Sequence, residues 1–218
     1  MVTAIQAGFA TFWGPYVYSH YKTEQDRITT VHDVLDALVF AFFTCLVAFE
    51  DVLFAIFPAY RDCLPIFPIL MLSAVFTILC EGTVYGISIA RRPIFDTIGI
   101  AMSSLGNIGL CILLVPRFGL LGAALALAAA NGCMFLFRTL VGQHFYRTVR
   151  SPLKTLCGWA VCIAVCTMGC VLSGQFLLKG VLCLAALAVF VLIYRAEVRF
   201  GVDFIKSFLG KRRTGHSS

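Results

Sequence analysis

Charged residues are scarce in this chain: Asp, Glu, Lys and Arg make up 13% of its 218 residues, whereas 60% are hydrophobic. Soluble domains carry about 25% charged residues, so this composition excludes the soluble enzyme classes. The mean hydropathy of +0.92 is typical of a polytopic membrane protein. Backbone polar groups cannot be left unpaired in lipid, and about 20 apolar residues form one span. We therefore expect an all-α membrane bundle of about seven transmembrane helices.

Motifs of catalysis and metal binding are also missing. The sequence has no nucleophile–base pair, no Gly-rich phosphate loop and no Asp-rich metal motif, so we expect neither an enzyme, a metal site nor a cofactor. Its ten cysteines form no Cys-x-x-Cys pair. Cys162, Cys166 and Cys170 share one helical face, and we interpret this stripe as helix packing rather than a redox group.

Seven apolar segments are predicted to cross the membrane. No Lys or Arg precedes the first, which therefore resembles a truncated membrane helix more than a secretory signal. Residues 19–33 are polar and are expected to form an exposed connection or a short surface helix. Residues 1–195 form the transmembrane domain and 196–218 a basic tail. The predicted spans are 1–18, 34–57, 64–90, 94–115, 118–141, 155–173 and 176–194.

The positive charges are distributed unevenly between the two sides of this bundle. One side, which includes the tail, holds 14 of the 17 Lys and Arg residues. The positive-inside rule then places the C-terminus in the cytoplasm and, with seven spans, the N-terminus outside. A first helix that starts outside is natural for the second half of a longer protein.

The segment 116–138 joins two spans through a break and a seam of small residues. Pro116 lacks a backbone donor and is expected to end the preceding apolar run. The small side chains after it allow another backbone to approach closely, which holds helices together in lipid. The seam consists of Gly119, Gly122, Ala123 and Ala126.

Ionisable groups within predicted spans are candidates for function, because they are costly in lipid. Glu81 is the strongest of these candidates, and it belongs to a stripe of polar residues at helical spacing. A water-filled cavity would explain that stripe, and a protonated Glu81 bonded to a neighbouring helix would explain it as well. The stripe is Ser73, Thr77, Glu81, Tyr85, Ser88 and Arg92; the next two spans add Asp96, Ser103, Asn107 and Asn131.

Three arginines are expected near the cytoplasmic end of such a cavity: Arg91, Arg92 and Arg138. Guanidinium groups bind phosphate through charge-assisted, often bidentate hydrogen bonds. Each arginine alone is also explained as a topology anchor that extends to the membrane surface.

Several short motifs together resemble the polysaccharide-export flippases of the multidrug/oligosaccharidyl-lipid/polysaccharide (MOP) superfamily. The resemblance covers about residues 1–195. Its motifs are Phe9-x-x-Phe12-x-x-Pro15-Tyr16, Tyr60-Arg61-Asp62, Gly86-Ile87-Ser88 and Pro116-Arg117-Phe118-Gly119-x-x-Gly122-Ala123-Ala124.

The resemblance implies the C-terminal part of a transporter that flips lipid-linked oligosaccharide across the bacterial inner membrane for polysaccharide or O-antigen synthesis. Such flippases have two helical lobes around a cavity that opens alternately to each side, and this chain resembles helices eight to fourteen. Its partner would be the missing N-terminal lobe, with no role for nucleic acid. Glu81, Tyr85, Asn107 and Asn131 would line the cavity, and the three arginines its mouth.

Two other interpretations stay open. A cation-coupled small-molecule antiporter of the same superfamily would use Glu81 as a proton or sodium carboxylate. A non-transporting membrane subunit, or an inert truncated product, is favoured by the missing lobe.

Overall fold

The computed structural model describes residues 11, 14–20, 25–146 and 152–195, and its described part is helical with no strand. The all-α class is therefore confirmed. The helices are α2 (Gln25–Ile56), the 3-10 helix η1 (Pro58–Cys63), α3 (Phe67–Thr83), α4 (Tyr85–Ile89), α5 (Pro93–Phe145), α6 (Pro152–Val171) and α7 (Phe176–Ile193).

Five helical segments in the described residues are long and apolar enough to span a membrane. They are Ile28–Ile56, Phe67–Ile89, Pro93–Phe145, Lys154–Val171 and Phe176–Ile193. Large apolar side chains cover their outer faces; Leu105, Ile112 and Leu177 are 71%, 72% and 82% exposed. Such a surface matches hydrocarbon rather than water, so these helices support a membrane location.

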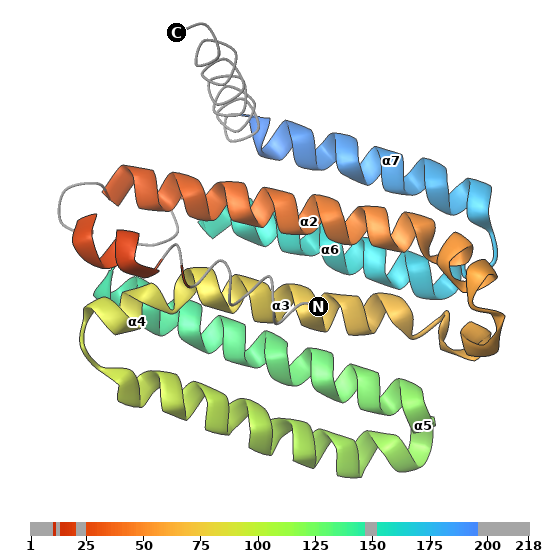
Figure 1. Ribbon diagram of the computed structural model, residues 1–218. Helices are drawn as coiled ribbons and strands as arrows, with labels where there is room; N and C mark the ends of the chain where they lie inside the picture. Colours follow the sequence, from red (N-terminus) through yellow and green to blue (C-terminus); the bar gives the residue numbers. More distant parts are fainter. Residues whose placement is uncertain (1–10, 12–13, 21–24, 147–151, 196–218) are drawn as a thin grey trace, which may run out of the picture.

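Helix α5 has 53 residues, about 80 Å at 1.5 Å per residue, whereas a bilayer core is about 30 Å thick. It is not one straight rod, because the chain reverses at Gly119 (φ 57°, ψ −130°) and its two arms lie side by side (Figure 1). This backbone conformation is accessible to glycine and strained for other residues. The expectation that Pro116 ends the span is thus wrong: Pro116 lies within the helix, three residues before the turn.

The small-residue seam lets the two arms of α5 approach each other. An ideal Cβ at Gly122 would lie 2.5 Å from the carbonyl oxygen of Leu114, so the second arm has no room for a side chain there. Ala126 is fully buried further along. Close van der Waals packing of this kind stabilises helix pairs in lipid.

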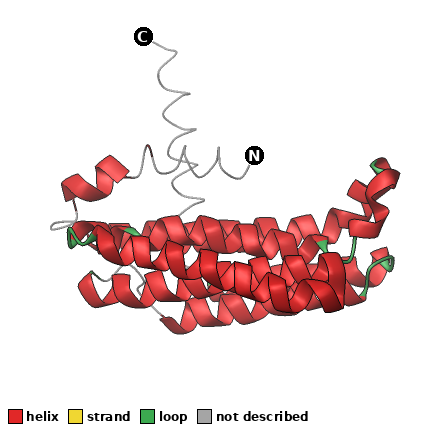
Figure 2. Ribbon diagram, turned by 90° about the horizontal axis from the view of Figure 1, so that it is seen from below, coloured by secondary structure: helices red, strands yellow, loops and turns green. Residues whose placement is uncertain are grey.

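The helices run nearly parallel or antiparallel in one bundle (Figures 1 and 2). Helix α7 lies on one side of α2, and the arms of α5 lie beyond α3 (Figure 1). Aromatic rings tie neighbouring helices together. Trp159 of α6 stacks on Phe76 of α3 and Phe135 of α5, with ring centroids 4.4 Å and 4.6 Å apart. Phe40 of α2 stacks on Phe190 of α7 at 5.5 Å.

The cysteine stripe lies in the core, as the packing interpretation requires. Cys162 and Cys166 are buried in the main hydrophobic cluster, and Cys170 packs against it. All ten cysteines fall within the described residues, and all are free thiols.

The predicted boundaries differ from the observed ones mainly at the start of the chain. Helix α2 begins at Gln25 rather than at residue 34, so the polar connection is largely helix. The predicted span 64–90 is divided at Val84 into α3 and α4. Most of the predicted span 1–18 and the tail 196–218 lie outside the described residues, although residues 14–20 are helical.

A glycine contact between α4 and α5 offers a test of this packing. An ideal Cβ at Gly86 would lie 2.6 Å from the carbonyl oxygen of Gly142. Overpacking of this kind costs about 1–3 kcal/mol, so Gly86→Ala should lower the thermal unfolding midpoint of the purified protein in micelles. Gly109→Ala is the matched control, since no atom lies within 4 Å of the added Cβ. Equal unfolding midpoints for the two variants would contradict this contact.

Candidate functional site

A buried cluster of three charged side chains joins α2 to α7. Lys179 has no exposed surface, and its Nζ lies 2.8 Å from Oε1 of Glu50, to which it donates a hydrogen bond. It also forms an ion pair with Asp51. The backbone N–H of Gly174 donates to Oδ1 of Asp51 at 3.2 Å, which ties the loop before α7 to the same carboxylate.

This charged cluster is costly to bury, so its geometry is constrained. Two carboxylates on successive residues of α2 face one ammonium group in the first turn of α7. A buried ion pair is stable only when its partners are well aligned, and loss of one partner leaves an uncompensated charge. The cluster therefore fixes the position of α7 along α2.

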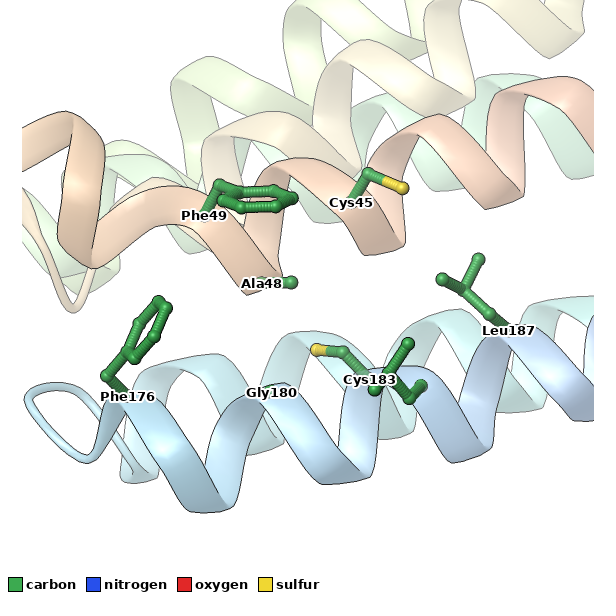
Figure 3. Close-up of a pocket in the computed structure, with 8 residues that line it drawn as sticks. Cys45, Ala48, Phe49, Phe176, Gly180, Cys183 and Leu187 are labelled. Carbon is green, nitrogen blue, oxygen red and sulfur yellow. The ribbon is translucent and has the colours of Figure 1, made fainter.

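Two cavities border the cluster, and they differ in character. A polar one of about 390 Å³ opens at the end of the bundle and is lined by Asp51, Arg61, Leu64, Pro65, Ser173, Gly174 and Phe176. An apolar one of about 190 Å³ lies between α2 and α7 and is lined by Cys45, Ala48, Phe49, Phe176, Gly180, Cys183, Leu184 and Leu187 (Figure 3). Only the first offers charged groups to a ligand.

A second ion pair links the two arms of α5 near the end opposite Gly119. Nη2 of Arg138 lies 2.6 Å from Oδ1 of Asp96. Arg138 is 7% exposed and its Nε is buried without a hydrogen-bond partner, whereas the Asp96 side chain is 30% exposed. The guanidinium group thus retains a buried donor that its carboxylate partner does not use.

A polar contact between α3 and both arms of α5 lies between these two charged regions. Nδ2 of Asn131 donates to Oγ of Ser73 at 2.8 Å and to Oγ1 of Thr77 at 3.4 Å. Ser103 of the first arm donates to Oδ1 of Asn131 at 3.5 Å. The amide is well satisfied, so it acts here as a helix-to-helix contact.

The other predicted cavity residues are not gathered around Asn131. Glu81 is half-buried, and Asn107 is half-buried with its Oδ1 3.6 Å from the Cys111 thiol. Tyr85 is buried in a small cluster with Val17 and Ile28. Neither cavity described above is lined by any of these residues.

The three arginines predicted at the mouth of the cavity do not lie together either. Arg138 is buried in its ion pair, whereas Arg91 and Arg92 are exposed on the turn between α4 and α5. Arg91 has a positive φ of 54°. The guanidinium carbon of Arg92 lies 5.7 Å from the centroid of the Phe145 ring, a cation–π distance.

Sequence reasoning missed the Lys179 cluster as a site. Glu50 and Asp51 lie near the end of the predicted span 34–57, and Lys179 lies near the start of the predicted span 176–194, but the spans alone do not predict that these residues pair. The available signal was the presence of a lysine within an apolar run, which calls for a partner. The partner itself lies 129 positions away.

The chain matches no protein-family model, no curated protein and no solved structure.

Removal of Lys179 tests the buried cluster. Breaking a buried ion pair by deleting one partner costs about 3–5 kcal/mol, so Lys179→Met should strongly lower the unfolding midpoint in micelles. The triple variant with Glu50→Gln and Asp51→Asn should recover much of this loss, because it leaves no unpaired charge. Arg117→Met, at an exposed position, is the control. Equal stability of Lys179→Met and the control would show that the cluster is not formed.

Proposed function

We propose that this chain is the C-terminal part of a MOP-type flippase that moves lipid-linked oligosaccharide across a bacterial inner membrane, with its C-terminus in the cytoplasm. The apolar spanning helices and the short motifs quoted above support this proposal. The observation that carries it is Arg138, a buried arginine between membrane helices with an unused donor.

Arg138 has the chemistry to receive a pyrophosphate group. Its guanidinium is held by Asp96, which is partly exposed and therefore replaceable by an anion that enters from the end of the bundle. Phosphate oxygens accept bidentate, charge-assisted hydrogen bonds, and the free Nε supplies one of the required donors. The exposed Arg91 and Arg92 belong to the turn that begins α5 and add positive charge at the end of that helix.

Transport then proceeds by exchange of anions at Arg138. The pyrophosphate head displaces Asp96 while the prenyl tail stays in lipid, and the half-buried Glu81 and Asn107 contact the sugars as the cavity changes sides. Release restores the pair between Arg138 and Asp96. The N-terminal lobe supplies the other wall of the cavity, since alternating access requires two repeats that move against each other.

A cation-coupled antiporter of the same superfamily is the second candidate. The excess of acidic over basic groups around Lys179 favours it, together with the half-buried Glu81 as the coupling carboxylate. Ion-coupled drug efflux without translocation of oligosaccharide would identify this activity.

A non-transporting membrane subunit is the remaining alternative, and co-purification with a separately encoded first lobe would argue against an inert product.

Substitution of Arg138 tests the flippase proposal in the complete transporter. A hydrogen bond to a charged group is worth about 1.5–3 kcal/mol, so Arg138→Ala should reduce translocation about tenfold or more. Arg138→Ala alone leaves Asp96 unpaired and should also lower the stability of the fold. Adding Asp96→Ala removes the unpaired carboxylate, so the double variant should recover stability but not transport. Arg117→Ala, beside the turn at Gly119 and therefore at the other end of the two arms, should transport normally.

Unchanged translocation in both Arg138→Ala and Glu81→Ala would refute the assigned site. Membrane abundance of each variant, measured by immunoblot, separates loss of transport from loss of protein.

A further inference from the structure

We propose that His32, Asp33 and Asp36, at the start of α2, bind a divalent first-row transition-metal ion. This site is separate from Arg138 and from the Lys179 cluster, and it does not depend on the transport function proposed above. One ligand atom from each residue lies within 4.8 Å of the others, and all three residues are buried.

The spacing of the three ligands along α2 brings them to one side of the helix. Residues four apart lie one turn apart on the same face, so the side chains of His32 and Asp36 can meet. Nδ1 of His32 lies 3.6 Å from Oδ2 of Asp36 and 3.9 Å from Oδ1 of Asp33. The imidazole therefore faces both carboxylates through the same ring nitrogen.

These distances are too long for hydrogen bonds but suit a shared ion. Tetrahedral bonds to Zn²⁺ of about 2.0–2.2 Å place neighbouring ligand atoms about 3.3–3.6 Å apart. The Asp36 distance already falls in this range, and a small side-chain rotation closes the remaining difference for Asp33. A direct hydrogen bond between imidazole and carboxylate would instead bring the two atoms to about 2.7–3.0 Å.

An independent observation is the unsatisfied polarity of this cluster. His32 and Asp36 are 4% and 1% exposed, yet both ring nitrogens of His32 and both carboxylate oxygens of Asp36 lack hydrogen-bond partners. Buried polar atoms are nearly always satisfied in native proteins, and an absent ion is one reason for exceptions. Because Nδ1 points toward the carboxylates, an ion between them would satisfy several of these atoms together.

Charge balance also favours a divalent cation. Metal ligation requires a neutral imidazole, and with it the two carboxylates give the cluster a net charge of −2; no ion pair joins either carboxylate to a Lys or Arg side chain that the structure describes. A divalent ion makes the cluster neutral, which lowers the cost of burial in a membrane helix. The mixture of one nitrogen and two oxygen ligands suits transition metals, since imidazole is a poor ligand for Mg²⁺ or Ca²⁺.

Helix α3 closes the site on the side of Gly82. An ideal Cβ at Gly82 would lie 2.9 Å from Cδ2 and 3.3 Å from Nε2 of His32. The absence of a side chain at Gly82 leaves space for the imidazole ring, and the contact holds the ring against α2. Gly82→Ala should therefore displace the ring and lower the affinity of the site for the ion.

Titration of the full chain in micelles with Mn²⁺ alone, and separately with Co²⁺ alone, tests the site. We expect one saturable ion per chain, and a Co²⁺ absorption spectrum without thiolate charge-transfer bands. Loss of a group that merely supports a metal ligand costs 10–100-fold in affinity, so Asp36→Asn and His32→Gln should each weaken binding at least tenfold. Asp62→Asn and His144→Asn are matched controls elsewhere in the chain and should bind like the unaltered protein.

Circular dichroism of each variant establishes that the helices remain, and Asp33→Asn serves as a further ligand variant if His32→Gln does not fold. Absence of saturable binding would overturn the proposal. Binding that none of the three ligand substitutions weakens, or a Co²⁺ spectrum dominated by thiolate bands, would place the ion elsewhere and would overturn it equally.

Discussion

A charged side chain inside a membrane must find its partner within the protein, and this constraint organises the bundle. The hydrophobic effect does not drive membrane helices together, so the apolar faces of α7 and α5 do not by themselves determine a unique position. Lys179 fixes α7 against α2 through Glu50 and Asp51, and Arg138 fixes the two arms of α5 through Asp96. The polar residues thus supply directional contacts, while small residues such as Gly122 determine how closely the helices approach.

The fold class and most spans were predictable, because long apolar runs leave few alternatives in lipid. Two local features were not. The chain reverses at Gly119 rather than at Pro116, since the turn needs a positive φ and a proline is tolerated inside the helix. The beginning of α2 was missed because its polar residues were interpreted as water-exposed. In the structure His32 and Asp33 are buried, and a hydropathy pattern cannot distinguish a polar face toward water from one toward neighbouring helices.

The candidate sites were predictable as single residues but not as pairs. Of the polar stripe that begins on α3, Ser73 and Thr77 meet Asn131 of α5. The contact of Glu50 with Lys179 joins distant parts of the chain, and a single sequence carries no signal for such pairing. The result is a bundle with a buried arginine near one end of α5, a carboxylate–lysine cluster where α2 meets α7, and an unsatisfied His–Asp cluster at the start of α2. A transporter of anionic lipids would use the buried arginine, whereas a metal-binding protein would use the His–Asp cluster.

The most direct test of the account is the sidedness of the α5 hairpin in sealed membrane vesicles. Single cysteines introduced by Arg92→Cys, Arg117→Cys and Gln143→Cys in a cysteine-free background would be labelled with a membrane-impermeant maleimide. Because α5 is expected to cross the membrane twice, residues 92 and 143 should react from one side and residue 117 only from the other. Reaction of all three positions from the same side would contradict a membrane-spanning hairpin, and with it the intramembrane location of the pair between Arg138 and Asp96.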